Sequence, residues 1–322
     1  MIIYSRKFIK IDNRKPIKKE KIMNKQIIVP LIGRLGNQMF EYAFAKSLEL
    51  EYGYDIFFDE SPLDALHIEN RLKGFVGCDE FKRIDKYNKT FLQKIGLRFF
   101  DKIADKEHLD KKFKHEKKFQ TLYSCLGLYL CHDGYIPFPK RTMGKRIICE
   151  GYFQSEKYFS KYKKEIIRDF TFKDEYIKGA REYLDTINQE VDTVCMHIRL
   201  GDYVSHPLHG VADIQYYLKA INYIRNLKPN SKIIVFSDNI DLVKQKLDNI
   251  ENCVYIPSTL TDHETMFLAS KCKDFIISNS SFSWWIQYLS GNKDKIVIAP
   301  SRWYAKPCPS ELFMNNWYLI EV

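Results

Sequence analysis

The sequence predicts an α/β protein built from two units of parallel strands and helices, with a mostly helical insertion in the first unit. From Gln26 onward, short apolar runs alternate with amphipathic stretches, and a second such series runs from Thr193 to the end. Between residues 79 and 145 the periodicity weakens. With 322 residues, 45% hydrophobic and 15% aromatic, the chain can bury one large core or two moderate ones, which excludes disorder and a small disulfide scaffold.

The first unit opens with a strand, a turn and a helix. Residues 27–32 predict the strand, residues 33–37 the turn, and residues 39–52 a helix that ends at Gly53. Residues 54–58 predict the next strand. Regular structure returns with a strand at 147–152, followed by helical stretches to residue 170 and from 174 to 189.

The second unit contains five strand candidates: residues 193–198, 232–236, 253–256, 274–277 and 295–299. Helices are expected to open near Asp213, Asn239, Thr261 and Ser281. We therefore expect an N-terminal α/β domain at residues 23–170 and a C-terminal Rossmann-like domain at residues 171–322.

The net charge of +10 is unevenly placed. Residues 1–22 contribute +6 and residues 81–120 contribute +7, so the rest of the chain sums to −3. The chain body that contains the motifs below is therefore not expected to bind nucleic acid. Residues 1–22 are expected to be a disordered basic extension or an upstream translation start, since they lack the apolar segment of a signal peptide.

Other features indicate the cytoplasm. The longest apolar run, at residues 122–131, is far shorter than the ~20 residues that span a bilayer. The eight cysteines include no Cys-x-x-Cys pair, which favours small buried side chains in a reducing compartment over disulfides or zinc.

Ligands of open α/β sheets bind beyond the carboxyl ends of the strands. At the first such place in the second unit, the chain reads His197-Ile198-Arg199-Leu200-Gly201-Asp202-Tyr203. Alternation along the strand places His197 and Arg199 on one side, and the arginine suits a phosphate or pyrophosphate. The alternative is a structural Arg199–Asp202 ion pair beside a histidine with satisfied hydrogen bonds.

A second strand end runs from Ser278 to Trp285, where the free N–H groups of a helix start can bind an anion. The polar candidates are Asn279, Ser280, Ser281 and Ser283. Ordinary helix capping accounts for one or two of these serines. We expect the aromatic residues Phe282, Trp284 and Trp285 to be core anchors.

A third strand end contains Ser237 and Asp238, and the carboxylate there suits a ribose hydroxyl or a base edge. Capping of the following helix is the alternative. Farther along, Thr261 and Glu264 match a capping box.

In the first unit, the turn Gly33-Arg34-Leu35-Gly36-Asn37-Gln38 matches neither Gly-x-Gly-x-x-Gly nor a Walker loop. Its two glycines allow backbone to approach a ligand closely, and Arg34 and Asn37 are expected to reach across a cleft. The chain has no Asp-x-Asp, and we interpret His206 and His209 as surface residues rather than metal ligands.

Taken together, residues 33–43, 151–159, 197–203 and 278–285 resemble the bacterial α-1,2-fucosyltransferases of glycosyltransferase family 11. Three positions depart from the usual pattern of that family. Arg34 and Glu41 replace a glycine and a glutamine, and Leu200 stands where a second arginine is common. With arginine at position 34, this turn resembles the Gly-Arg-x-Gly-Asn-Gln stretch of the protein O-fucosyltransferases.

The resemblance implies a GT-B fold, in which two Rossmann-like domains face a central cleft. It also implies that the C-terminal domain binds GDP-fucose, that no metal or other cofactor is needed, and that fucose reaches the 2-hydroxyl of a galactose-like residue with inversion. Arg199 and His197 would be catalytic. Asp202 is the first candidate for the catalytic base, and Glu41 and His209 are the next candidates. The alternative role of Asp202 is to position Arg199 or His197. The donor-binding residues would be Arg34, Gly36, Asn37, Ser237, Asp238, Asn279, Ser280, Ser281 and Ser283.

The leading hypothesis is a cytoplasmic enzyme of surface-polysaccharide synthesis that uses GDP-fucose and a galactose-terminated, lipid-linked glycan. The alternatives are a transferase for another GDP-sugar or a protein acceptor, and a non-catalytic nucleotide or polyanion binder. We expect residues 60–145 to determine the acceptor. The two basic segments also predict a peripheral contact with an anionic inner membrane.

Overall fold

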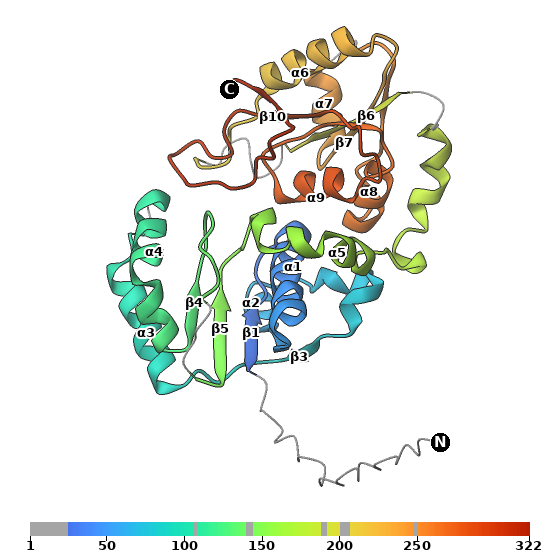
Figure 1. Cartoon of the computed structure of the whole chain (residues 1–322). Coiled ribbons are helices and arrows are strands. Elements are labelled where there is room, and N and C mark those ends of the chain that lie inside the picture. The colour runs from blue at the N-terminus through green and yellow to red at the C-terminus, as the bar shows by residue number, and fades with distance from the viewer. Residues whose placement is uncertain (1–24, 106–107, 140–143, 188–191, 200–206, 248–249) are drawn as a thin grey trace, which may run out of the picture.

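Two parallel β-sheets form the framework of the protein in a computed structural model that describes residues 25–105, 108–139, 144–187, 192–199, 207–247 and 250–322. The expected extension at residues 1–22 and the candidate base Asp202 lie outside the described residues. The first sheet has the order β3-β2-β1-β5-β4, and the second has the order β11-β10-β9-β6-β7-β8 (Figure 1). The strands of the first are β1 (Gln26–Pro30), β2 (Asp55–Asp59), β3 (Lys82–Ile84), β4 (Leu128–Leu130) and β5 (Arg146–Glu150). Those of the second are β6 (Thr193–Ile198), β7 (Lys232–Ser237), β8 (Cys253–Tyr255), β9 (Asp274–Ile276), β10 (Val297–Pro300) and β11 (Tyr318–Ile320).

The helices of the described residues cover both sheets, and α1 and α9 lie against each other between them (Figure 1). They are α1 (Leu35–Tyr52), α2 (Ser61–Ala65), α3 (Phe91–Ile103), α4 (Leu109–Cys125), α5 (Lys163–Asp169), α6 (Ile214–Leu227), α7 (Ile240–Lys246), α8 (Asp262–Ala269) and α9 (Ser281–Leu289). Within the described part of the chain, no helix combines the length and apolar character needed to cross a membrane.

Helix α1 confirms the first predicted helix and extends it. It begins at Leu35, four residues before the expected start, and ends where Gly53 adopts a left-handed conformation with φ of 66°. The N–H of Gly53 donates to the carbonyl of Glu49 at 2.8 Å, which closes the last turn. Its apolar side chains Phe40 and Phe44 are buried.

The segment at residues 79–145 is mostly helical in its described part, as expected, although its strands were not predicted. It contains α3 and α4, but it also supplies two strands, β3 and β4, at the two edges of the first sheet. Each has three residues, too few to produce a readable periodicity, and each is fixed by pairing with a longer neighbour. The short strand β11 was likewise not predicted. In the stretch predicted to be helical at 174–189, the described residues 174–187 form the 3₁₀ turns η5 (Asp174–Tyr176) and η6 (Gly179–Thr186) rather than an α-helix.

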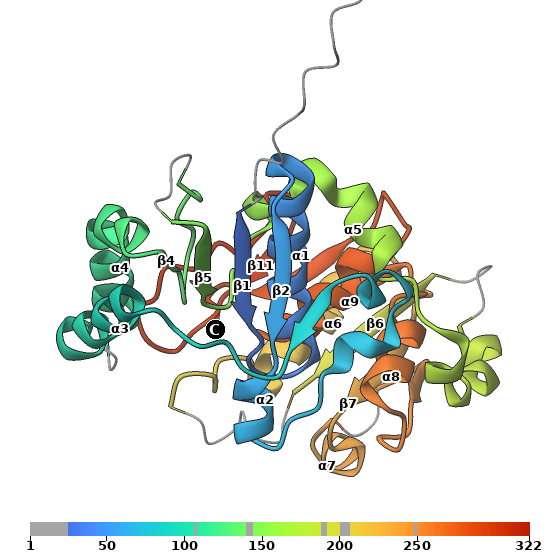
Figure 2. The same ribbon diagram turned by 90° about the horizontal axis from the view of Figure 1, so that it is seen from below.

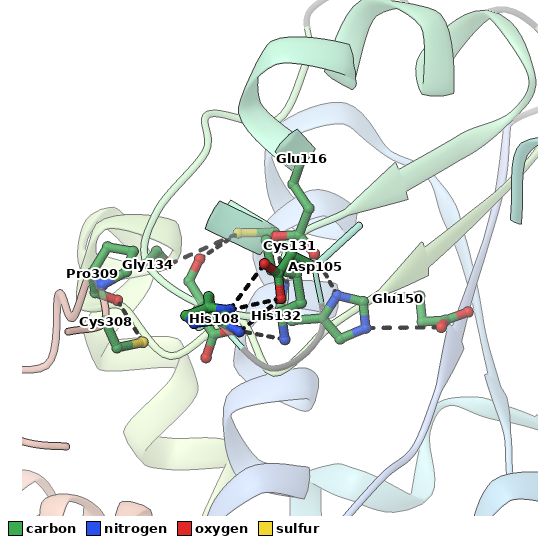
Figure 3. A network of polar contacts seen from close by, with 11 residues as sticks. Asp105, His108, Glu116, Cys131, His132, Gly134, Glu150, Cys308 and Pro309 are labelled. Carbon is green, nitrogen blue, oxygen red and sulfur yellow. Dashed lines mark hydrogen bonds and ion pairs between the residues drawn. The ribbon is translucent and has the colours of Figure 1, made fainter. Parts of the chain in front are cut away.

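Helix α4 is held to the end of β4 by a buried carboxylate, shown close up in Figure 3. Glu116 is fully buried and accepts a hydrogen bond from the backbone N–H of His132 at 3.2 Å. The imidazole Nδ1 of His132 lies 2.5 Å from the same carboxylate. A buried charge is tolerated only where it is hydrogen-bonded, so this pair fixes the position of α4 on the edge of the sheet.

The two units share one apolar core. The ring of Phe40 in α1 lies 4.7 Å from Trp284 and 5.0 Å from Trp285 in α9, and both tryptophans are fully buried. The indole N–H of Trp285 donates to the carbonyl of Gly36 at 3.1 Å. Both tryptophans are therefore core anchors, as predicted. We propose the boundary between the two domains at residues 170 and 171, in the connection from β5 to β6.

Candidate active site

A cavity of about 500 Å³ lies between the two units, at the carboxyl ends of their strands. The first residues of α1 and α9 meet at this cavity and both line it, in agreement with the rule that ligands bind beyond strand ends. Nine of the predicted site residues line the cavity: Arg34, Gly36, Asn37, His197, Arg199, Ser237, Asp238, Ser280 and Ser281. Of the four motifs that resemble family 11, the cavity is lined by residues of three, at 33–43, 197–203 and 278–285, together with Ser237 and Asp238.

The glycines at the start of α1 are required by close contacts. Gly33 has φ of 74°, and a Cβ there would lie 2.4 Å from the amide nitrogen of Asn37. A Cβ on Gly36 would lie 2.5 Å from the backbone nitrogen of Phe282 at the start of α9. Only glycine therefore lets the starts of α1 and α9 approach this closely.

Arg34 occupies the position just before α1 and exposes its side chain to the cavity. Its backbone is extended, with φ of −92° and ψ of −177°, and its side chain does not cap the helix. Among the described residues, the guanidinium has no hydrogen-bond or ion-pair partner. It is therefore available to an anionic ligand.

Asn37 joins three motifs that are distant in the sequence. Its Oδ1 accepts hydrogen bonds from the hydroxyl of Ser281 at 2.7 Å and from Nε2 of Gln154 at 2.9 Å. Gln154 follows Phe153, which has φ of 49° and stacks on Phe44 with ring centroids 4.0 Å apart. Since both lone pairs of Oδ1 are used, only the amide N–H groups of Asn37 remain for a ligand.

At the start of α9, the polar residues divide into two groups. Ser280 caps the helix by accepting a hydrogen bond from the N–H of Phe282 at 3.3 Å, and it lines the cavity with Ser281. The side chain of Asn279 instead donates to the carbonyls of His209 at 3.0 Å and Trp303 at 2.9 Å. Asn279, expected to bind the donor, is buried beside the cavity rather than on its surface.

His197, which lines the cavity, forms a buried pair with Ser283, which does not. The Nδ1 of His197 lies 2.6 Å from the hydroxyl of Ser283, which lies 2.8 Å from the hydroxyl of Ser278. Burial, and then the charge of Arg199, lowers the pKa of His197 to about 3. An imidazole with this pKa is neutral near pH 7 and is a weak proton acceptor there. Ser283, also expected to bind the donor, is fully buried against His197.

Arg199 is held beside the cavity by a neighbouring strand end. Its Nε lies 3.4 Å from a carboxylate oxygen of Asp238, which follows β7. Asn239, rather than Asp238, caps α7, with its Oδ1 accepting from the N–H of Leu242 at 3.1 Å. The carboxylate of Asp238 thus orients the arginine and faces the cavity.

The phenylalanine at position 282 is not a core anchor. It is half-buried, lines the cavity, and lies 5.2 Å from the ring of His197.

The capping box of α8 is confirmed, since the N–H of Glu264 donates to Thr261 Oγ1 at 3.3 Å and Glu264 Oε2 accepts from the N–H of Thr261 at 2.9 Å.

Several cavity residues were not predicted from the sequence, among them Ile68, Ser258, Leu260, Asp262 and Thr265. Most follow β8 or open α8, so the strand-end rule, applied to this short strand, could have found them. The carboxylate of Asp262 lies 3.0 Å from a guanidinium nitrogen of Arg71, which links α8 to the first unit.

The two reserve candidates for the catalytic base differ in position. His209 lines the cavity. Glu41 is fully buried, and its carboxylate accepts hydrogen bonds from the backbone N–H of Ile32 at 3.1 and 3.2 Å. Burial raises the pKa of Glu41 well above its ordinary value. Within the described residues, no three His, Cys, Asp or Glu side chains form a metal-binding group.

Two parallel α/β sheets that enclose a polar cavity between their strand ends form a fold of the GT-B type, which confirms the expected fold. The fold is similar to the crystal structure of NodZ from Bradyrhizobium, described as an alpha-1,6-fucosyltransferase. That similarity has a TM-score of 0.53 and 14% sequence identity, and it covers 83% of this chain and 92% of that one.

The chain belongs to glycosyl transferase family 11, whose model matches residues 133–321. It is 30% identical to the O-antigen biosynthesis glycosyltransferase WbnK of Escherichia coli, across 89% of this chain and 98% of that protein. It is 28% identical to an alpha-1,2-colitosyltransferase of the same species, across 92% and 99% of the two chains. It also matches a galactoside 2-alpha-L-fucosyltransferase of Caenorhabditis elegans, at 25% identity over 52% of this chain.

The buried surroundings of Glu41 explain how a glutamate can stand where family 11 commonly has a glutamine. A carboxyl whose pKa is raised well above its ordinary value is neutral over a wider pH range. A neutral carboxyl has a donor group and an acceptor oxygen at the same two positions where a glutamine side chain has its NH₂ group and its carbonyl oxygen. Glu41 can therefore replace the glutamine of the family without a buried charge.

Proposed function

We propose that this enzyme transfers L-fucose from GDP-β-L-fucose to the 2-hydroxyl of a terminal galactose-like residue, forming an α-1,2 linkage in a bacterial surface polysaccharide. Membership of family 11 supports this, as do relatives named for O-antigen synthesis and for alpha-1,2 transfer. The observation that carries the proposal is the single cavity into which Arg34, Arg199 and the starts of α1 and α9 converge.

This arrangement suits the departure of GDP. When the bond between fucose C1 and the phosphate oxygen breaks, its electron pair stays on the β-phosphate. Arg199 and the free N–H groups at the start of α9 would offset that charge. The second arginine common in the family is absent at Leu200, and we propose that Arg34 supplies a guanidinium from the first unit.

The other residues receive supporting roles in this proposal. Asp238 and Ser237 would bind the ribose or base of the donor, and the N–H groups of Asn37 would bind the sugar or the diphosphate. His197, which is neutral and buried, positions the end of β6 through Ser283 rather than transferring a proton. With two arginines and two helix starts present, we propose that no metal is required.

Inversion needs the acceptor oxygen to attack C1 from the side opposite GDP while its proton passes to a base. We propose Asp202, three residues beyond Arg199, as that base. His209 is the second candidate because it lines the cavity. A transfer of another GDP-sugar is the alternative activity, because one relative is named for colitose.

Turnover of a donor panel tests the function. The purified protein is incubated with GDP-fucose, GDP-colitose, GDP-mannose and UDP-galactose, each with terminal-galactose acceptors, and GDP or UDP release and product linkage are measured. We expect an α-1,2-fucosyl product and its loss in Arg199→Ala. Absence of turnover with GDP-fucose, or full activity of Arg199→Ala, contradicts the proposal. The lipid linkage of the acceptor and the cytoplasmic location stay predictions.

A further inference from the structure

Helix α3 has an apolar surface on the side that faces away from the protein. Phe91, Leu92 and Ile95 are 75%, 52% and 41% exposed. The opposite side of the helix, including Phe100, packs with Tyr123 of α4 and Leu128 of β4. The exposed side is therefore not needed for the core, and exposing three neighbouring large apolar side chains to water is unfavourable.

Two of these side chains, Phe91 and Leu92, border a groove of about 670 Å³. Phe91 and Leu92 line one side of it, Cys125 and Leu126 at the end of α4 line another, and Arg146 at the start of β5 contributes a cation. Leu122, one turn before Cys125, is also exposed. We define the α3 patch as the apolar residues Phe91, Leu92, Ile95, Leu122 and Cys125.

Cations surround the α3 patch. Lys94, Arg98 and Lys102 are exposed on α3 itself, and no described residue forms an ion pair with them. Lysines on α4 extend the positive surface. Among the described residues from 86 to 125, ten are Lys or Arg and four are Asp or Glu. The surface is thus both apolar and strongly positive.

We propose that the α3 patch docks on an anionic lipid bilayer, with its apolar side chains at the boundary between headgroups and acyl chains and its cations on the lipid phosphates. A bilayer surface offers an apolar layer beneath a negative one, which matches both properties. A second copy of the chain matches poorly, because a symmetric contact would place the same cations opposite each other. A soluble polyanion would leave the apolar side chains exposed to water.

The position of the α3 patch is compatible with activity at the membrane. Helices α3 and α4 project to one side of the molecule beside β4, the edge strand of the first sheet (Figure 2). No residue of either helix lines the cavity described above. A bilayer bound at the α3 patch would therefore leave the donor cavity open, and the inference does not depend on which sugar is transferred.

Vesicle flotation of the full chain tests the proposal. The vesicles contain phosphatidylglycerol and phosphatidylcholine in a one-to-two ratio, with pure phosphatidylcholine as the neutral comparison. Substituting Lys94, Arg98 and Lys102 by Gln is expected to lower the partition coefficient on the order of 100-fold, since each cation near an anionic surface contributes about fivefold. Substituting Phe91, Leu92 and Ile95 by Ser is expected to lower it at least about tenfold.

The matched control replaces Lys244, Lys246 and Lys271, exposed lysines of the second unit, by Gln. It makes the same change in net charge and should retain most of the binding. The proposal is overturned if the wild type does not bind the anionic vesicles, if either α3 variant binds like the wild type, or if the control loses as much as the charge variant. Thermal unfolding verifies that the variants are folded. Turnover with a water-soluble acceptor is measured separately, so a failure of the proposed transfer is distinguishable from a failure of docking.

Discussion

Helices α1 and α9 both begin at the cavity, but they use their first residues differently. At the start of α9, Ser280 caps the helix and Ser283 bonds His197, so these side chains build the framework. At the start of α1, Arg34 caps nothing and exposes its guanidinium. The comparison teaches that one helix offers its backbone N–H groups to a ligand from a rigid framework, whereas the other offers a charged side chain.

Substitution of Arg199 and of Arg34 is expected to give the largest effects on turnover and to distinguish the roles of the two arginines. Arg199, oriented by Asp238, would face the charge that develops on the leaving phosphate. Arg199→Gln should lower kcat by about 10²–10³-fold, because such donors act mainly in the transition state. Arg34→Gln should mainly raise the KM for GDP-fucose, by roughly 10-fold or more. Steady-state kinetics checks both, and equal changes in kcat would contradict the division of roles.

Gly36→Ala tests whether the close approach of the two helix starts matters. The added Cβ would lie 2.5 Å from the backbone nitrogen of Phe282, so α1 and α9 must move apart. We expect the free energy of unfolding to fall by about 1–3 kcal/mol, with a loss of turnover. Gly291→Ala is the control, since its Cβ would meet nothing within 4 Å and should change stability by less than about 0.5 kcal/mol. Urea unfolding measures both, and equal stability of the two variants would argue against the contact.

His197 makes the framework sensitive to acid. Its pKa is about 3 in the folded protein, below the ~6.5 of an unfolded histidine, so the unfolded chain binds more protons between these values. The contribution of His197 to stability is therefore present above pH ~6.5 and is lost as the pH falls toward 3.

His197→Asn should remove on the order of 2 kcal/mol of the stability difference between pH 8 and pH 5. Asparagine retains a polar group near Ser283. Urea unfolding of both proteins at the two pH values gives the comparison. An unchanged pH dependence in the variant would show that His197 is protonated in the folded protein at pH 5.

Ser281→Ala is expected to give the smallest effect. It removes the hydrogen bond to Asn37 Oδ1, whose length is 2.7 Å, while Gln154 still donates to the same oxygen. We expect a loss of about 1 kcal/mol in stability. Ser281→Thr retains the hydroxyl and should recover most of it. Calorimetric melting curves of the three proteins test this, and identical curves would mean that the bond contributes nothing.

The sequence identified much of the cavity because parallel strands align their carboxyl ends. Arg199, Ser237 and Ser280 each lie at or just beyond the carboxyl end of a strand, and the structure brings all three to one cavity. Asn279 and Ser283 follow the same strand as Ser280, but their side chains are buried in the protein and do not line the cavity. Their directions depend on partners distant in the chain, such as the carbonyl of Trp303, and no local pattern reveals such partners.

The errors in the fold have a similar cause. Strands β3 and β4 contain three residues each and were hidden within a segment that otherwise predicts helices. They form because β2 and β5 offer unpaired edges, which is a property of the assembled sheet rather than of the segment. The exposed apolar residues of α3 were equally invisible, since a helical apolar pattern does not state which side is buried.

The central claim is that the cavity between α1 and α9 binds the diphosphate of a nucleotide sugar. Calorimetric titration with GDP and with GMP, on the wild type, Arg34→Gln and Arg199→Gln, tests it most directly. The account predicts that each substitution weakens GDP binding by roughly 10-fold or more, and weakens GMP binding less because the β-phosphate is missing. GDP affinities that are the same in all three proteins would contradict it.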